Sequence, residues 1–292
     1  MSHQEQILSK VRSIGAMPAA ATEVMRLVRD PNVTVAALTR AIELDPWLTS
    51  NVLRLANSAY FGTPRSAASV KEAIVRLGMN RVFQLVVASV VAPMEQQPVK
   101  GYDLPAGALW EHSVAVAVGT VELASALSMK APDHAFTAGL LHDIGKVVLG
   151  TFLDVDAEPI MTLAFEQAVS FEQAEQRVLG IDHAEVGAVL LESWKLPISI
   201  VDAVRYHHRP EELCGADRVV DLVHVADALA LMAGLGAGSD GLNYRVSDSL
   251  PARLAVTTHI AESVTCRMLS ALDDLRALFS AHAGRSPWPL TY

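Results

Sequence analysis

Residues 138–146 run Ala-Gly-Leu-Leu-His-Asp-Ile-Gly-Lys, and they place His142 and Asp143 side by side in an otherwise apolar segment. The pattern is typical of a helix, so we expect both polar side chains in a helical core. An ionised carboxylate beside an imidazole is costly to bury unless something neutralises it, and a divalent metal ion does so well. A single His-Asp pair is also explained by a hydrogen bond in the core, so further ligands must be sought elsewhere in the chain.

The composition predicts a soluble, cytoplasmic, globular protein. The chain has 292 residues, of which 51% are hydrophobic and 19% charged, and it contains two cysteines, too few for a disulfide framework. The formal net charge of −9 argues against a nonspecific nucleic-acid or anionic-membrane surface, so we expect neither partner. The start has no signal-peptide pattern, and apolar runs such as 82–94 are shorter than the roughly 20 residues that span a bilayer.

Helical periodicity extends over nearly the whole chain and predicts an all-α fold. Helix starts are indicated by Pro18, Thr34, Asp45-Pro46 and Ser69, and Gly78 indicates a helix end. Beyond the Pro- and Gly-containing linker 93–105, we expect helices near 106–128, 132–153, 157–178, 183–194, 197–208 and 216–234. This organisation predicts an N-terminal helical subdomain, residues 1–98, and a helical core with C-terminal helices, residues 99–292. A Gly-rich loop is expected at 234–241.

Further histidines and an aspartate accompany the His-Asp pair in helical segments. Five histidines and two aspartates suffice for two metal ions that share one carboxylate. For any one of them, a hydrogen-bonded core role or a solvated surface role is the simpler explanation, and we assign His3, His134, His224, His259 and His282 to that category. The candidate metal ligands are His112, His142, Asp143, His183, His207, His208 and Asp227.

The candidate ligands resemble those of the HD superfamily of metal-dependent phosphohydrolases, and the two-metal HD-GYP branch in particular. The resemblance implies that His112, His142, Asp143 and Asp227 hold one ion, and that Asp143 bridges to a second. The second ion would be held by His183, His207 and His208. Asp143 and Lys146 are the candidate catalytic residues, since Lys146 matches the lysine that contacts a substrate phosphate in the family's HDxxK pattern.

The chain departs from the HD-GYP pattern in two places. No Gly-Tyr-Pro motif follows the paired histidines, where Arg209-Pro210 stands instead. Ala108 occupies the position of a carboxylate that would be needed for a third metal ion. Hydrolysis of cyclic di-GMP is therefore not supported, and two metal ions are expected rather than three.

Residues 14–92 resemble the front half of the HDOD family, the HD-related output domain of bacterial signalling proteins. The matching stretches are Met17-Pro18, Asp30-Pro31, residues 42–49 (Ile-Glu-Leu-Asp-Pro-Trp-Leu-Thr), residues 53–62 (Leu-Arg-Leu-Ala-Asn-Ser-Ala-Tyr-Phe-Gly) and residues 69–78 (Ser-Val-Lys-Glu-Ala-Ile-Val-Arg-Leu-Gly). With the HD-like core, the resemblance covers about 14–235. It implies an HDOD-type bacterial signal-transduction or regulatory protein, and many family members act by interaction. Asn57 and Ser58 are expected to fix a helix end or to cross-link two segments.

Three functions remain open at this point. The first is a regulatory module that retains its metal pair and binds signalling protein partners. The second is a phosphohydrolase or phosphodiesterase acting on a phosphorylated small molecule or nucleotide. In that function Lys146, with Arg205 or Arg209 as further candidates, would neutralise the phosphate charge, although a solvated helix end explains the arginines as well. The third is a di-iron oxygenase, for which no organic substrate pocket is indicated. Two divalent ions chosen among Fe, Mn, Ni or Zn are expected, and the C-terminal helix 254–278 either completes the core or forms a homo-oligomer interface.

Overall fold

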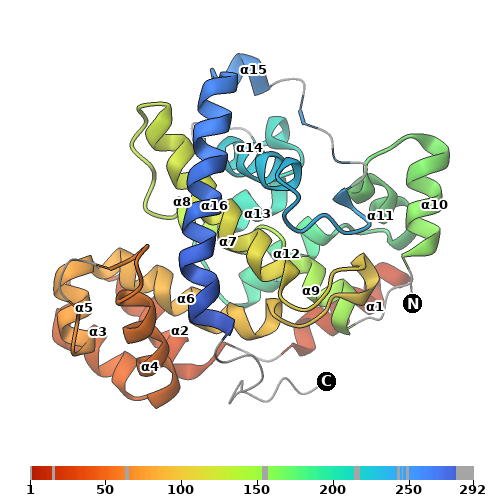
Figure 1. The fold of residues 1–292 in the computed structure, drawn as a ribbon. Helices are drawn as coiled ribbons and strands as arrows, with labels where there is room; N and C mark the ends of the chain where they lie inside the picture. Colours follow the sequence, from red (N-terminus) through yellow and green to blue (C-terminus); the bar gives the residue numbers. More distant parts are fainter. Residues whose placement is uncertain are drawn as a thin grey trace. The chain divides into compact units, whose positions relative to one another are not determined.

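The structure is a computed structural model, and it describes residues 2–14, 17–62, 66–152, 157–213, 218–241, 244, 246–247 and 250–280. Within these residues the chain forms helices and turns, with one isolated bridge between Val99 and Leu104 and no strand. The predicted all-α class is confirmed (Figure 1). The helices are α1 (His3–Ser13), α2 (Ala19–Val28), α3 (Val35–Glu43), α4 (Pro46–Ala56), α5 (Val70–Leu77), α6 (Met79–Glu95), η1 (Lys100–Tyr102), α7 (Ala108–Ala126), α8 (Ala135–Leu141), α9 (Ile144–Val147), η2 (Val148–Phe152), α10 (Glu158–Gln167), α11 (Phe171–Leu179), α12 (His183–Ser193), α13 (Ile198–Tyr206), η3 (Pro210–Glu212), α14 (Val219–Met232), α15 (Leu250–Arg253) and α16 (Thr258–Ser280).

The described residues group into two compact units. Unit 1 combines α1 with the chain from Glu95 to Ser270, and unit 2 combines α2 to Met94 with the end of α16 from Ala271. This grouping differs from a single division at 98/99. The first helix joins the later residues because it packs on α12 and η2, where Ile7 and Val11 are buried.

Unit 2 is built from short helices whose starts are fixed by local side-chain caps. The side chains of Thr34, Asp45 and Ser69 each accept a hydrogen bond from a backbone amide in the first turn of the helix that follows. Gly78 ends α5 with φ 83°, a conformation that a side chain disfavours. The predicted helix starts and this predicted helix end are therefore confirmed.

Asn57 cross-links two segments of unit 2, as predicted. Its side-chain nitrogen donates to the Ala67 carbonyl at 3.0 Å, and its side-chain oxygen accepts from the Ala67 amide at 2.6 Å. The Ser58 hydroxyl donates to the Leu55 carbonyl near the end of α4. These bonds hold the turn after α4 against the segment that leads into α5.

The core of unit 1 surrounds α7, which is buried along most of its length. α7 packs against both α8 and α14, while α12 packs against α9 and α13 (Figure 1). Within unit 1, the first part of α16 also lies on α7, since a Cβ on Gly119 would lie 2.8 Å from the Met268 sulfur. This part of α16 completes the core of unit 1, where Val264 and Met268 are fully buried.

Two of the predicted helices are broken in the structure. The predicted helix 132–153 is divided into α8, α9 and η2, because Asp143 leaves the helical conformation with φ −103° and ψ 10°. The predicted helix 157–178 is divided into α10 and α11, because Ala168 adopts a left-handed conformation with φ 49°. The predicted linker at Pro93 also begins later, since α6 continues to Glu95. Among the described residues, no helix is both long and apolar enough to cross a membrane.

Candidate metal centre

Two of the predicted ligands lie inside long buried helices. His112 lies in the second turn of α7, and Asp227 lies in the middle of α14. The two helices pack against each other, which brings the His112 Nε2 atom to 3.1 Å from the Asp227 Oδ1 atom. Both side chains are almost completely buried. The carboxylate that looked out of place in an apolar helix thus faces an imidazole across the core.

The break between α8 and α9 sets the directions of the His142 and Asp143 side chains. His142 ends α8, and the non-helical Asp143 precedes the first residue of α9. Gly145 allows α9 to approach α12 closely, since a Cβ at this position would lie 1.8 Å from the His183 carbonyl oxygen. The helix break and this glycine therefore place Asp143 between its own helix pair and the start of α12.

The remaining three ligands lie at helix ends. His183 is the first residue of α12, and the side chain of Asp182 caps that helix by accepting from the Glu185 amide at 2.8 Å. His207 and His208 follow the end of α13. Adjacent residues at a helix end are not held to the roughly 100° separation of helical neighbours, so both imidazoles can face one point.

The first cluster consists of His112, His142 and Asp227, whose potential ligand atoms all lie within 4.8 Å of one another. The Nε2 atoms of His112 and His142 are 3.2 Å apart. Both also face the Asp143 Oδ2 atom, at 3.5 Å from His112 and 3.3 Å from His142. The histidines are 1% and 0% exposed, so this cluster has no access to solvent.

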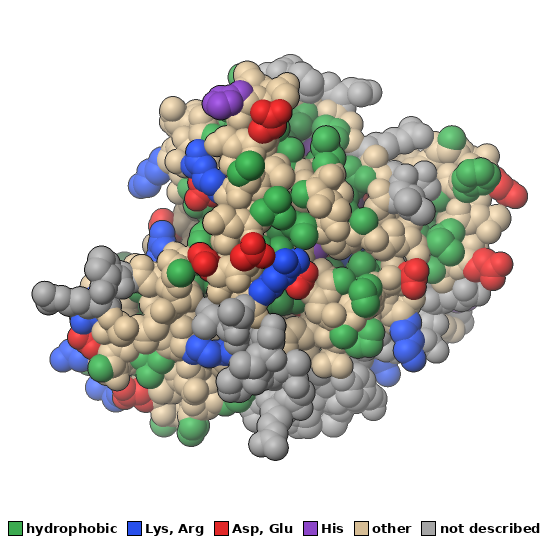
Figure 2. Space-filling view, in the orientation of Figure 1, with side chains coloured by type: hydrophobic (Ala, Val, Ile, Leu, Met, Phe, Trp, Pro, Cys, Tyr) green, Lys and Arg blue, Asp and Glu red, His purple; other side chains and the backbone are tan. Residues whose placement is uncertain are grey.

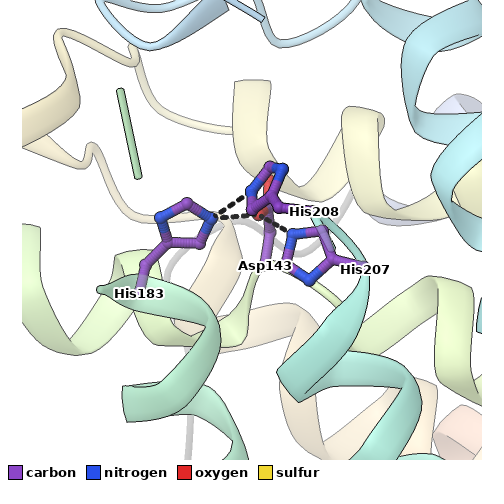
Figure 3. A group of neighbouring side chains, drawn as sticks. All are labelled: Asp143, His183, His207 and His208. Atoms are coloured by element: carbon purple, nitrogen blue, oxygen red, sulfur yellow. Dashed lines mark hydrogen bonds and ion pairs between the residues drawn. The ribbon is translucent and has the colours of Figure 1, made fainter. Parts of the chain in front are cut away.

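The second cluster consists of Asp143, His183, His207 and His208, again with ligand atoms within 4.8 Å of one another (Figure 3). The Nε2 atoms of His183 and His208 are 2.8 Å apart. The Asp143 Oδ1 atom lies 3.4 Å from the His183 Nε2 atom and 3.7 Å from the His207 Nε2 atom. Asp143 therefore directs one carboxylate oxygen to each cluster. His208 is the one histidine of the two clusters that is only half-buried.

The hydrogen bonds of the imidazole rings test whether the residues fit a metal ion. The Nδ1 atoms of His112, His142 and His207 lie 2.7–3.0 Å from backbone carbonyl oxygens, which only accept hydrogen bonds. In the neutral imidazoles, Nδ1 therefore carries the hydrogen, and the Nε2 lone pairs point toward one another and toward Asp143. The Nε2 atom of His207 and the Oδ1 atom of Asp143 are buried without a hydrogen-bond partner. Converging lone pairs and orphaned buried acceptors fit a cation, so the residues match a metal centre.

The electrostatics of the clusters lead to the same requirement for positive charge. Burial lowers the pKa of His142, but Asp143 and Asp227 outweigh burial and raise it to about 10. Burial also lowers the pKa of His183, but Glu175 outweighs it and raises that pKa to about 9. In the second cluster, burial and neighbouring positive charge hold the pKa of His207 well below its usual value. Without a metal ion, the carboxylates thus keep His142 and His183 protonated. A bound metal cation would take the place of those protons.

Lys146, the predicted phosphate contact, is buried and paired with two carboxylates. Its Nζ atom lies 2.5 Å from the Asp143 Oδ2 atom and 2.5 Å from the Asp240 Oδ2 atom. Burial disfavours the charge, but the two carboxylates outweigh it and raise the pKa of Lys146 above its usual value. The face in Figure 2 shows one prominent histidine, near the top of the view.

The Gly-rich segment 234–241, which we call the capping segment, lies over this centre. The Leu235 carbonyl oxygen lies 3.0 Å from the His112 Nδ1 atom, and the Ser239 amide donates to the Tyr102 carbonyl at 2.9 Å. At Gly236 a Cβ would lie 2.5 Å from the His112 Cβ, so only glycine permits this approach. Beyond the capping segment, the Tyr244 ring lies 5.7 Å from the His208 ring between centroids.

The structure brings all seven predicted ligands together and adds residues that the sequence analysis missed. Glu175 bonds the Nδ1 atom of His183 at 2.7 Å, and Asp240 pairs with Lys146. His224, assigned to the surface or core, bonds the His207 carbonyl through Nδ1 at 2.6 Å. Each lay in an ordinary amphipathic or loop pattern, so no local signal distinguished it.

The arginines suggested as phosphate contacts are engaged elsewhere. Arg205 pairs with Glu185 and Glu192, at 2.8 Å in both cases. Arg209 pairs with Asp182 at 3.1 Å. Neither pairing involves a ligand of the two clusters. Of the other histidines, His282 lies outside the described residues.

Comparisons with known proteins agree with this arrangement. The family model for the HDOD domain matches residues 14–210. A solved HDOD domain protein of unknown function from Geobacter sulfurreducens is 26% identical, with a TM-score of 0.68 over 95% of this chain and 97% of that one. A candidate phosphohydrolase from Shewanella amazonensis SB2B is 27% identical, with a TM-score of 0.63 over 91% and 99% of the two chains.

One curated relative also matches. An uncharacterised protein from Treponema pallidum (strain Nichols) is 28% identical over 216 residues, which cover 70% of this chain. The matched region spans 40% of that relative, so this chain corresponds to less than half of its length.

Proposed function

Because the chain belongs to the HDOD family, we propose that it is a signal-transduction protein that retains a two-metal His/Asp centre and acts by binding partner proteins. The observation that carries the proposal is the closure of the centre by the chain's own residues. Lys146 would be the cation nearest to a bound phosphate, yet Asp143 and Asp240 already neutralise it. Catalysis needs a reachable ligand position, and here Lys146 and the ligands of the first cluster are buried.

Residues from two other segments of the chain also cover the metal centre. Tyr102, from the predicted linker, is 2% exposed, and the Lys146 Nζ atom lies 5.8 Å from the centre of its ring. The capping segment bonds both Tyr102 and His112. A centre enclosed in this way suits a regulatory module, in which the bound ions stabilise one conformation of the protein.

We assign the two ions to the two clusters. His112, His142 and Asp227 would hold the first, His183, His207 and His208 would hold the second, and Asp143 would give one oxygen to each. Imidazole and carboxylate ligands suit Fe, Mn, Ni or Zn. When bound, such a pair supplies Lewis acidity and lowers the pKa of a coordinated water. We place this protein in the cytoplasm, where its few cysteines stay reduced.

The second candidate function is a phosphohydrolase or phosphodiesterase acting on a nucleotide-like substrate. It is favoured by the half-buried His208, which leaves one side of the second cluster nearest to solvent. The similarity to the Shewanella candidate phosphohydrolase is in keeping with it. In this function Lys146 would exchange Asp240 for a substrate phosphate, and Asp143 would hold both ions.

Elemental analysis of the purified protein tests the proposal, with Asp143→Ala as the comparison. We expect close to two metal ions per chain, and close to none in the variant, because Asp143 alone faces both clusters. The metal-loaded protein is then assayed against a generic phosphodiester substrate. Turnover that depends on Lys146 would favour the second function, and no stoichiometric metal in the unaltered protein would overturn the two-metal centre.

A further inference from the structure

Glu175 is a buried carboxylate that contacts a single predicted ligand from behind. It lies on α11 and is 0% exposed. Its Oε2 atom accepts the backbone amide of His183 at 3.0 Å and lies 2.7 Å from the Nδ1 atom of the same residue. The Nδ1 atoms of His112, His142 and His207 lie instead near neutral backbone carbonyls. His183 is therefore distinguished by a negatively charged partner.

A carboxylate accepts hydrogen bonds and does not donate them, so the hydrogen of the neutral His183 ring lies on Nδ1. The Nε2 lone pair then faces the second cluster, 2.8 Å from the His208 Nε2 atom and 3.4 Å from the Asp143 Oδ1 atom. A carboxylate behind a histidine fixes the orientation of the ring and makes it a stronger electron donor to a metal ion.

We propose that Glu175 is a positioning residue that sets the affinity of the second cluster for its metal ion, with little effect on the first. This inference rests on the two-metal centre proposed above. The first cluster has no equivalent carboxylate, since its two histidines bond the Leu235 and Gly139 carbonyls. Loss of the Glu175 charge should therefore weaken the binding of the second ion alone, whereas a general loss of packing would weaken the binding of both ions.

Tyr102 holds the other oxygen of Glu175. Its hydroxyl donates to the Glu175 Oε1 atom, so donors engage both carboxylate oxygens and restrict rotation of the carboxylate. The edge of the Tyr102 ring also meets the His183 ring, with centroids 6.2 Å apart and planes at 90°. The same residue accepts a hydrogen bond from the capping segment through its carbonyl. Tyr102 thus connects the segment that covers Lys146 with the residue that orients His183.

The test compares Glu175→Gln with Glu172→Gln, a variant on the same helix. Glu172 bonds the Ser170 hydroxyl rather than a ligand and interacts with His183 only through its charge, so it controls for loss of a nearby negative charge from α11. The probe is Zn²⁺, titrated into the metal-free full chain against a competing chelator. We expect Glu175→Gln to weaken the second binding event about 10- to 100-fold, to leave the first event unchanged, and Glu172→Gln to alter neither.

Two further variants grade the effect. Glu175→Leu removes the acceptor altogether and should weaken the second event more than Glu175→Gln, whose amide oxygen still accepts from Nδ1. Tyr102→Phe keeps the ring and removes the hydroxyl, so it should weaken the second event only a few-fold. If the Glu175 variants fail to fold, Tyr102→Phe tests the inference instead, because it should also weaken the second binding event and not the first.

Equal affinity for both ions in Glu175→Gln and in the unaltered protein would overturn the inference. Equal weakening of both events would also overturn it, because that result indicates a structural role for Glu175. Failure of the unaltered protein to bind two ions is a different outcome, since it would contradict the two-metal centre itself.

Discussion

The two clusters share Asp143 but are built differently. The first lies between the long buried helices α7 and α14 and the end of α8, and its histidines bond backbone carbonyls. The second is assembled from helix ends, with a carboxylate behind His183 and a half-buried His208. A ligand inside a packed helix is held by the whole core, whereas a ligand at a helix end depends on its immediate neighbours.

The comparison indicates that one centre can combine a site held rigidly by the core with a site whose metal affinity depends on a few neighbouring residues. The first cluster belongs to the core that stabilises the fold. The second cluster is connected, through Glu175 and Tyr102, to the capping segment over Lys146. We therefore expect changes at the first cluster to affect folding stability, and changes at the second to affect metal and ligand binding.

Removal of both ions should give the largest effect on stability. Each ion at 1,000 times its Kd contributes about 4 kcal/mol, so two ions contribute about 8 kcal/mol, which corresponds to roughly 15–20 °C in Tm for a chain of this size. Thermal unfolding of the metal-loaded and chelator-treated protein measures this shift. An unchanged Tm would mean that the metal ions do not stabilise the fold, which would contradict the role given to the first cluster.

Variants of single ligands should affect the two clusters differently. His142→Ala should lower the free energy of unfolding by about 3 kcal/mol, because it opens a buried cavity and removes the partner of the Gly139 carbonyl. In the metal-free protein His208→Ala should cost less than about 1 kcal/mol, since the side chain is half-buried, and in the metal-loaded protein it should release only the second ion. Denaturant unfolding and metal analysis of both variants measure these effects. Similar costs for the two variants would remove the distinction between the clusters.

The metal-free protein should lose stability as the pH rises above neutrality. The pKa values of His142 and His183 in the folded state are raised to about 10 and about 9, above the value near 6.5 expected when unfolded. Their contribution is therefore complete below pH 6.5 and is lost as the pH rises from 6.5 to 10, by about 1.4 kcal/mol per pH unit for each histidine. Urea unfolding at pH 7, 8 and 9 measures the slope.

Two comparisons sharpen the pH prediction. The metal-loaded protein should lack this slope, because ions occupy the positions that the protons take. Glu175→Gln should reduce the slope without abolishing it, since it removes the main cause of the raised pKa of His183 and leaves His142 unaffected. A slope that is unchanged by metal loading would contradict the assignment of these histidines as ligands.

The smallest expected effect concerns the Asp240–Lys146 pair. Asp240→Asn removes one of the two carboxylates that neutralise Lys146, so inorganic phosphate should bind the metal-loaded protein a few-fold more tightly. Calorimetric titration of both proteins measures the change, with Asp273→Asn as a control, since Asp273 pairs with Arg276 on α16. If Asp240→Asn binds phosphate no better, the pair does not close the site against anions.

Local signals in the sequence predicted much of the fold. Thr34, Asp45 and Ser69 are side-chain caps whose hydrogen bonds are made within one turn, so neighbouring residues alone determine them. The all-α class followed from periodicity that is repeated in segment after segment. The ligand set was predicted from the order of the histidines and aspartates together with the resemblance to the HD superfamily, and the structure brings those residues together.

The features that were not predicted depend on contacts between distant segments. The helix break at Asp143 accompanies the close approach of Gly145 to His183, a contact between segments that no local pattern reveals. Glu175 lies in a polar stretch of α11, where a solvated carboxylate is the ordinary expectation, and contacts with distant residues such as Tyr102 and His183 bury it. Asp240 lies in a Gly-rich segment that was expected to be a loop, and its partner Lys146 is 94 residues away in the sequence.

The central claim is that one carboxylate, Asp143, joins two metal sites. A crystal structure of the protein grown with Zn²⁺ or Mn²⁺, with data collected at the absorption edge of that metal, tests it most directly. The account predicts two anomalous peaks, one beside His112, His142 and Asp227 and the other beside His183, His207 and His208, with Asp143 between them. A single peak, or peaks that Asp143 does not contact, would contradict it.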